Sequence, residues 1–295
     1  KEFVDLRVFR RCRRQLAGQD CFLFGNLLDE SSVFPGFSGR FPGVAGVSRL
    51  FDQHRCDLGV FREIGREFIA DDVLDGRTRF LRETTERIRS AVSNPSFLVT
   101  SRMNLFDGFP YPYGWGCDRS DPPVPDMSEP LQLVGILKGL GLNLLTTSTG
   151  TPYYNPWLVR PFDRLIPGNI EAPEHPLEGV ARLFALTARV QKEYPDLPTA
   201  GSGYTWLRQF GVFAAAANVA RKAVTFAGFG RTGFAYPELP RDVLEKGAVD
   251  PKKVCVSCSL CSEVMGQGGS TGCYAKDREV YGPMLKAHRA SRKEM

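Results

Sequence analysis

Segments typical of strands, loops and helices alternate about four times between residues 96 and 247, and this alternation limits the fold more than any other feature. Repeated strand–helix units are typical of a parallel sheet covered by helices. The longest loops follow strands, on the side of a βα barrel where active sites lie. Strands are expected from 97 to 102 and from 142 to 149, and strands ending in glycine turns at 197–203 and 223–231.

Helices are expected between these strands, and several residues mark their ends and faces. Ser128 is expected to cap the free amides of a helix that runs to Leu140, and Gly141 to end it. Gly247 closes a short helix in the same way. The expected helices are 78–92, 128–140, 177–194, 205–222 and 237–247. The buried face of the first one carries Leu81, Thr85, Ile88 and Val92.

The first 76 residues differ from the rest. Residues 2–9 read as one strand, whereas residues 10–75 follow neither a strand nor a helix period. This makes about five strands, and a closed barrel needs eight strands and about 250 residues. The expected fold class is α/β, a partial (β/α)8 TIM barrel comprising about the last five βα units. The expected divisions are 1–76, the barrel half at 77–248, and a cysteine-rich loop and tail at 249–295.

Composition excludes several classes of protein. The 295 residues are 42% hydrophobic and 24% charged, as in ordinary globular proteins. No uncharged apolar run of about 18 residues and no signal-peptide layout is present, so a cytoplasmic protein with no membrane partner is expected. The net charge of +5 is mild. The arginine run at 7–14 lacks the patterns of nucleic-acid-binding domains, so no nucleic-acid partner is expected.

Four of the eight cysteines are clustered near the C-terminus. Two successive steps of two intervening residues separate Cys255, Cys258 and Cys261, and Cys273 follows a glycine-rich return. Three thiolates at this spacing can point inward from one loop, as in ferredoxins, and a fourth completes the ligand set of a 4Fe–4S cluster. Zinc is the alternative, although structural zinc sites usually use two separated cysteine pairs. The other cysteines, Cys12, Cys21, Cys56 and Cys117, are expected to be free and buried.

Two glycine turns follow the last two predicted strands. Gly201, Ser202 and Gly203 form the first, and Gly230 with Arg231 ends the second. Glycines let backbone amides approach an anion closely, and the last two βα loops of barrels often form a phosphate site. Either turn alone is weak evidence for a phosphate site. The presence of both turns in consecutive βα units indicates such a site, and Arg231 would add a positive charge to it.

Arg102 lies at the end of the strand predicted from residue 97. One interpretation is a salt bridge at the rim of the sheet. The other is a fixed positive charge beside a flavin ring, where it would stabilise the anionic reduced form.

From about Arg77 onward the sequence resembles the NADH:flavin oxidoreductase (Old Yellow Enzyme) family, in the branch of trimethylamine dehydrogenase and 2,4-dienoyl-CoA reductase. The similar stretches are RTRFLRE, SRMNLFDG, AGSG, FAGFGRTGFAYP and CVSCSLC followed by GC. The resemblance implies an FMN-binding barrel that takes a hydride from NAD(P)H and reduces a small molecule such as an activated alkene.

The resemblance also implies roles for single residues. Arg102 would stand near the flavin N1 and O2, and Gly201, Ser202 and Gly203 at the phosphate turn after the seventh strand. Gly230 and Arg231 would form the turn after the eighth, and the four clustered cysteines would ligate a 4Fe–4S cluster that passes single electrons. Tyr153 and Tyr154, after the sixth strand, are candidate catalytic residues facing the flavin; packing roles are the alternative.

The sequence departs from the family in its first part. The histidine motif expected before residue 77 is absent, and residues 7–75 are expected to be a divergent insertion or a shifted reading frame. The early barrel strands are also expected to be missing. The alternative function is therefore a catalytically incomplete fragment that acts as a cluster- or zinc-binding interaction module. A homo-oligomer is left open.

Overall fold

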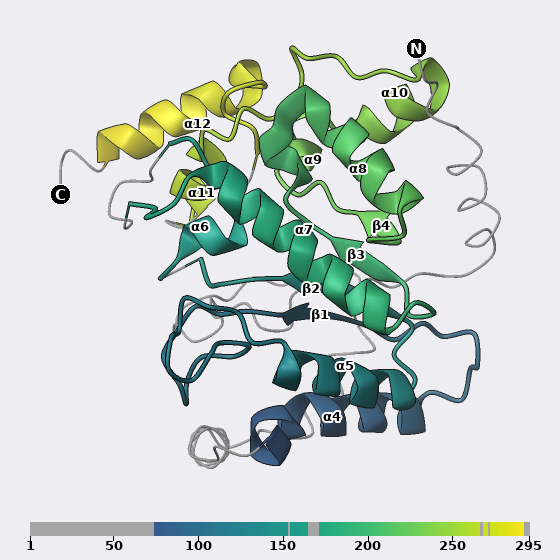
Figure 1. The fold of residues 1–295 in the computed structure, drawn as a ribbon. Helices are drawn as coiled ribbons and strands as arrows, with labels where there is room; N and C mark the ends of the chain where they lie inside the picture. The colour runs from purple at the N-terminus through teal and green to yellow at the C-terminus, as the bar shows by residue number, and fades with distance from the viewer. Residues whose placement is uncertain (1–73, 153, 165–170, 266–267, 271, 292–295) are drawn as a thin grey trace.

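The computed structural model describes residues 74–152, 154–164, 171–265, 268–270 and 272–291. These residues form a mixed α/β fold around a four-stranded parallel sheet in the order β1-β2-β3-β4 (Figure 1). The strands are β1 (Thr100–Asn104), β2 (Leu144–Ser148), β3 (Thr199–Gly201) and β4 (Phe226–Ala227). The helices are α4 (Leu74–Ala91), α5 (Ser128–Gly139), α6 (Pro156–Val159), α7 (Pro176–Glu193), the 3-10 helix η2 (Tyr204–Phe210), α8 (Gly211–Ala220), α9 (Thr232–Ala235), α10 (Leu239–Lys246), α11 (Leu260–Met265) and α12 (Arg278–Ser291). The predicted alternation of strands and helices is confirmed.

The strand register lines up one row of residues across the whole sheet. Arg102 pairs with Thr146, Thr146 with Ala200, and Ala200 with Phe226. We call these four residues the Arg102 row. Since side chains alternate between the two faces of a strand, Leu145 points to the face opposite the row. Leu145 is completely buried, whereas Arg102 is exposed and the rest of the row is partly exposed.

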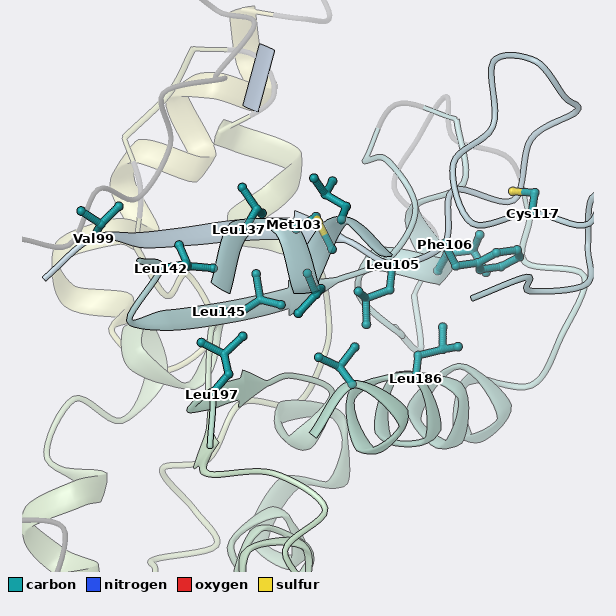
Figure 2. Packing of buried hydrophobic residues seen from close by; sticks show 14 residues of the cluster. Val99, Met103, Leu105, Phe106, Cys117, Leu137, Leu142, Leu145, Leu186 and Leu197 are labelled. Carbon is teal, nitrogen blue, oxygen red and sulfur yellow. The ribbon is translucent and has the colours of Figure 1, made fainter. Parts of the chain in front are cut away.

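Helices α5 and α7 cover the face that carries Leu145. Leu137 of α5 and Val190 of α7 are completely buried in the same cluster as Leu145, and Figure 2 shows Leu137, Leu145 and Leu186 packed around the strands. The cluster comprises Val99, Met103, Leu105, Phe106, Cys117, Leu133, Val134, Leu137, Leu142, Leu145, Leu158, Leu186, Val190 and Leu197. Crossovers between neighbouring parallel strands are right-handed, so a sequential strand order brings successive helices to one face.

Helix positions agree with the sequence pattern. Helix α4 covers the predicted segment 78–92 except for Val92; its Thr85 is buried, and Leu81 and Ile88 pack against the core. Gly141 follows α5 with φ +89° and Gly247 follows α10 with φ +65°. Both angles lie in the left-handed region that glycine adopts without strain, so the two predicted helix ends are confirmed.

The prediction that Ser128 caps α5 is wrong. Ser128 is the first residue of the helix, and its hydroxyl donates to Asp126 Oδ1 at 2.6 Å. The same carboxylate oxygen accepts the backbone amide of Ser128 at 2.9 Å. Asp126 thus forms a turn onto the first residue of α5, and the Ser128 hydroxyl acts as a donor to this carboxylate instead of accepting an amide of the helix.

The helix predicted at 205–222 is divided into two. The 3-10 helix η2 precedes α8, and Arg208 near the division has φ 53° and ψ −128°, outside the helical region. The Arg208 guanidinium donates to Asp163 Oδ2 at 2.7 Å, and the Trp206 indole donates to Asp163 Oδ1 at 2.8 Å. Both contacts join this segment to the loop after β2. Contacts with such a distant residue leave no mark in the local sequence period, so the division of the helix was not predicted.

The C-terminal elements are tied to the rest of the structure by charged groups. Glu263 of α11 is buried and lies 3.7 Å from Arg164, in the loop after β2, and 3.5 Å from Arg289 of α12. The amide of Asp163 donates to the Ser257 carbonyl at 3.3 Å, which joins the loop after β2 to the cysteine segment. In Figure 1, α11 and α12 lie together at one side of the molecule.

Asp242 of α10 gives the stability a predictable pH dependence. Its buried carboxylate accepts hydrogen bonds from Lys246 Nζ at 2.8 Å and from the Tyr236 hydroxyl, and the Lys246 bond is the main reason why the pKa of Asp242 is lowered from 3.8. A carboxyl with a depressed folded pKa stabilises the fold above its unfolded pKa, and that stability is lost as pH falls through the folded value. We expect the urea midpoint of the wild type to exceed that of Asp242→Asn at pH 6, and the gap to narrow as pH falls below about 4. A gap that stays constant down to the acid limit would contradict this origin.

Several sequence predictions concern residues outside the described ranges. These are the strand at 2–9, the aperiodic segment at 10–75 and the thiols of Cys12, Cys21 and Cys56. Cys117, by contrast, is described and is buried, as predicted.

None of the described helices combines the length and the apolar character needed to cross a membrane.

Candidate functional site

The carboxyl ends of the four strands meet at one edge of the sheet, as in any parallel arrangement. Arg102 belongs to this edge because its guanidinium extends beyond its own row, donating from Nη2 to Ser148 Oγ at 2.9 Å. Ser148 is the last residue of β2 and is buried. Although Arg102 as a whole residue is exposed, partial burial of its guanidinium beside Ser148 lowers its pKa from 12.5. The rim salt bridge considered for Arg102 is not among the ion pairs of the described residues, and its contact at this edge is with a hydroxyl.

A network of side-chain amides holds the two long loops at this edge together. Asn104 Nδ2 donates to Asp107 Oδ1 at 2.9 Å and to the Gly150 carbonyl at 2.7 Å. Asn155, 4% exposed, donates to the Asp107 carbonyl at 2.6 Å and accepts the Thr151 amide at 2.7 Å. Burial raises the pKa of Asp107. Sequence reasoning did not identify Asn155 or Asp107, whose partners lie more than 40 residues away in the other loop.

The two tyrosines proposed as catalytic stand in the loop after β2. Tyr153 lies outside the described residues. Tyr154 is 64% exposed, and its ring packs edge-on against Phe109 with centroids 5.3 Å apart. Phe109 belongs to the loop after β1, so this contact also joins the two loops. The exposed phenol remains accessible to a molecule at the edge of the sheet.

The two glycine turns lie side by side. The Gly228 amide donates to the Gly201 carbonyl at 2.7 Å, directly beyond the paired ends of β3 and β4. A β-carbon at Gly228 would stand 3.0 Å from the Gly201 carbonyl oxygen, so the close approach requires glycine there. Gly203 has φ +104° and precedes η2, while a β-carbon at Gly230 would meet open space. The two glycine corners thus lie together at the carboxyl ends of β3 and β4.

Arg231 follows the second turn and is accompanied by an arginine that the sequence did not indicate. Arg231 Nη2 donates to the Pro161 carbonyl at 2.6 Å, next to Arg160 in the chain. Burial, and then repulsion from Arg231, lowers the pKa of Arg160 to about 10, while the Cys261 thiolate opposes this shift. The Nη1 atoms of both arginines are buried without a hydrogen-bond partner among the described residues. Two unpaired donors that repel each other are complementary to an anion.

All four clustered cysteines line one small pocket. The lining residues are Arg231, Phe234, Cys255, Val256, Cys258, Ser259, Leu260, Cys261, Cys273, Tyr274, Ala275 and Lys276. All four thiols are free, and burial raises the pKa of Cys255, with Cys261 and Cys273 adding to the rise and Arg231 opposing it. The chain therefore brings together the four cysteines that the sequence grouped, from the loop before α11 and from the return that precedes α12.

Zinc and a 4Fe–4S cluster place different demands on four cysteines. Among the described residues, no three His, Cys, Asp or Glu side chains are arranged to hold a metal ion. A single zinc ion draws each sulfur to about 2.3 Å from one point. A cube of four irons and four sulfides binds one cysteine at each corner, so its ligands stand farther apart around a shared centre. Four cysteines around one pocket supply the donor set that both kinds of metal group use.

Comparison with known proteins adds no family to this arrangement. The sequence matches no family model and no curated protein. The strand edge and the cysteine pocket are therefore the features that bear on function.

Proposed function

We propose that this chain is the C-terminal part of an FMN-dependent NAD(P)H oxidoreductase that carries a 4Fe–4S cluster. The observation that carries the proposal is the position of Arg231. This residue directly follows the glycine turn after β4 and also lines the pocket of Cys255, Cys258, Cys261 and Cys273. A phosphate-binding turn and a cluster loop that share one residue would bring two redox groups close together.

The fold supports a partial (β/α)8 barrel. A doubly wound sheet reverses its strand order and places helices on both faces. Here the order is sequential, and α5 and α7 cover the face opposite the Arg102 row. In a barrel that row would face the interior, where polar and small residues such as Thr146 and Ala200 suit a cofactor site at the strand ends.

The described residues suit the parts of FMN. The Gly201–Gly203 and Gly228–Gly230 corners would receive the phosphate through backbone amides, and Arg231 would add a charged donor. Arg102 would hold a positive charge beside the N1 and O2 edge of the ring, where negative charge builds up on reduction. Tyr154, and Tyr153 beside it in the sequence, would donate a proton or hydrogen bond to the substrate.

The chemistry that bound FMN supplies is hydride transfer from NAD(P)H to an activated alkene or similar acceptor, and the cluster supplies single-electron transfer. The pocket would hold the cluster through the four cysteines. Arg231 and Lys276, which also line it, would balance the negative charge of an assembly of four thiolates. Asn104, Asn155 and Asp107 would fix the loops around the flavin edge.

Anaerobic purification followed by an absorption spectrum and metal analysis tests the proposal. Flavin together with about four irons per chain is the expected result. Iron without flavin would favour the alternative of a cluster-binding interaction module, which the partial exposure of the Arg102 row also allows. Zinc without iron would contradict the proposal and indicate a structural zinc site.

A further inference from the structure

Two serines alternate with the first three cysteines of the pocket. Both are buried, and their hydroxyls make no hydrogen bond within the described structure. Ser257 is 0% exposed and Ser259 is 3% exposed. The hydroxyl oxygen of each has no hydrogen-bond partner among the residues that the structure describes. A buried hydroxyl without a partner is destabilising, since it gives up its hydrogen bonds to water and receives none in return. An acceptor supplied by a group bound beside these serines would remove this cost for both hydroxyls.

The backbone conformation at these two positions would favour glycine over serine. Ser257 has φ +53° and Ser259 has φ +59°. Both angles lie in the left-handed region, where glycine is unstrained and a β-carbon is unfavourable. The loop thus carries a side chain at two positions where backbone geometry alone would favour glycine. Strain of this kind is found where the side chain has a function.

The position of the serines indicates what the hydroxyls meet. Ser257 stands between Cys255 and Cys258, and Ser259 between Cys258 and Cys261. The Ser257 amide already donates to Cys255 Sγ at 3.4 Å, and Ser259 lines the same pocket as the four cysteines. Thiolate and sulfide sulfurs are anionic hydrogen-bond acceptors. A cluster in this pocket would turn the cysteine thiols into thiolates and would add its own sulfides as further acceptors.

We propose that the hydroxyls of Ser257 and Ser259 donate hydrogen bonds to the sulfurs of the cluster and raise its reduction potential. This inference rests on the proposed function, because it needs the cluster in the pocket. Reduction adds one electron from an external reductant to the cluster, and each hydroxyl keeps its proton throughout. Hydrogen bonds to sulfur stabilise the more negative reduced state, so their loss makes the cluster harder to reduce.

Matched substitutions separate the hydroxyl from the backbone strain. Ser257→Ala and Ser257→Gly both remove the hydroxyl, and only glycine also relieves the positive φ; Ser259→Ala and Ser259→Gly form the second pair. The midpoint potential of each iron-loaded protein would be measured by dithionite titration followed by electron paramagnetic resonance. We expect a lower potential in all four variants, equal within each pair, whereas the glycine variant of each pair has the higher urea midpoint. Ser270→Ala is the control, because Ser270 is exposed in the same segment and its carbonyl, which accepts the Tyr274 hydroxyl, is retained.

The possible failures are distinguishable. Variants that keep the wild-type iron content and the wild-type potential would overturn the inference and leave the proposed function standing. A potential that falls in the alanine variants alone would also overturn it, since the cause would then be backbone strain. Wild-type protein without iron would refute the proposed function itself.

Discussion

Replacing Cys255 by serine is expected to abolish iron binding. Cys255 is the most buried of the four cysteines that line the pocket. A serine hydroxyl at this position is a poor ligand for iron at neutral pH because, unlike a thiol, it does not readily lose its proton. With three sulfurs left, one corner of the cluster stays open to water. Iron per chain should fall from about four to near zero, and the broad cluster absorbance should disappear with it.

Cys117→Ser is the control for this experiment. Cys117 is also buried, but it lies beside the loop after β1, where its sulfur accepts the Gly108 amide at 3.2 Å. We expect this variant to keep its full iron content. A far-UV circular dichroism spectrum of both variants shows whether the fold is retained. Equal iron loss in both, with folded protein, would mean that the effect comes from lost core packing rather than from ligation.

Replacing Leu145 by alanine is expected to destabilise the fold by about 2–5 kcal/mol. Leu145 is completely buried in β2, within the core that α5 and α7 share (Figure 2). The variant loses the transfer free energy of the removed methyl groups, and a cavity remains because strand pairing on both sides limits collapse. Urea unfolding monitored by tryptophan fluorescence measures the change in the free energy of unfolding.

Leu244→Ala provides the matched comparison. Leu244 belongs to α10 and is 52% exposed, so the same chemical change removes little buried surface. We expect a change within about 0.5 kcal/mol. If both substitutions had the same small effect, the face of the sheet that carries Leu145 could not be the packed one, and the assignment of the Arg102 row to the open face would fail with it.

Much of the fold could be predicted because it depends on local patterns. A strand forms at each of the four places expected between residues 96 and 231, although β1 runs two residues past its predicted end, and Gly141 and Gly247 end their helices. The spacing of the cysteines also predicted that the four thiols would lie close together, because short intervals between cysteines restrict the directions of their side chains. Each of these features depends on residues that are close together in the chain, so it can be predicted from a short stretch of sequence.

Other features depend on distant partners and left no signal in the sequence. Arg160 stands in an ordinary loop stretch, and its importance emerges only where Arg231, 71 residues later, lies close by. Asn155 resembles any loop asparagine until the Asp107 carbonyl is found beside it. The break at Arg208 follows from Asp163, in the loop after β2. The cap at α5 was misassigned because the Ser128 hydroxyl donates to Asp126, two residues earlier, and so does not accept an amide of the helix.

The sequential strand order has a consequence for how the chain is made. Every pairing in the described sheet joins a strand to the next one along the chain, across a connection that contains one or two helices. As the polypeptide leaves the ribosome, each new strand can therefore dock on the strand synthesised just before it, without waiting for a distant segment. The cysteine loop emerges after β4, so a scaffold of four strands can already be in place when the four clustered cysteines appear.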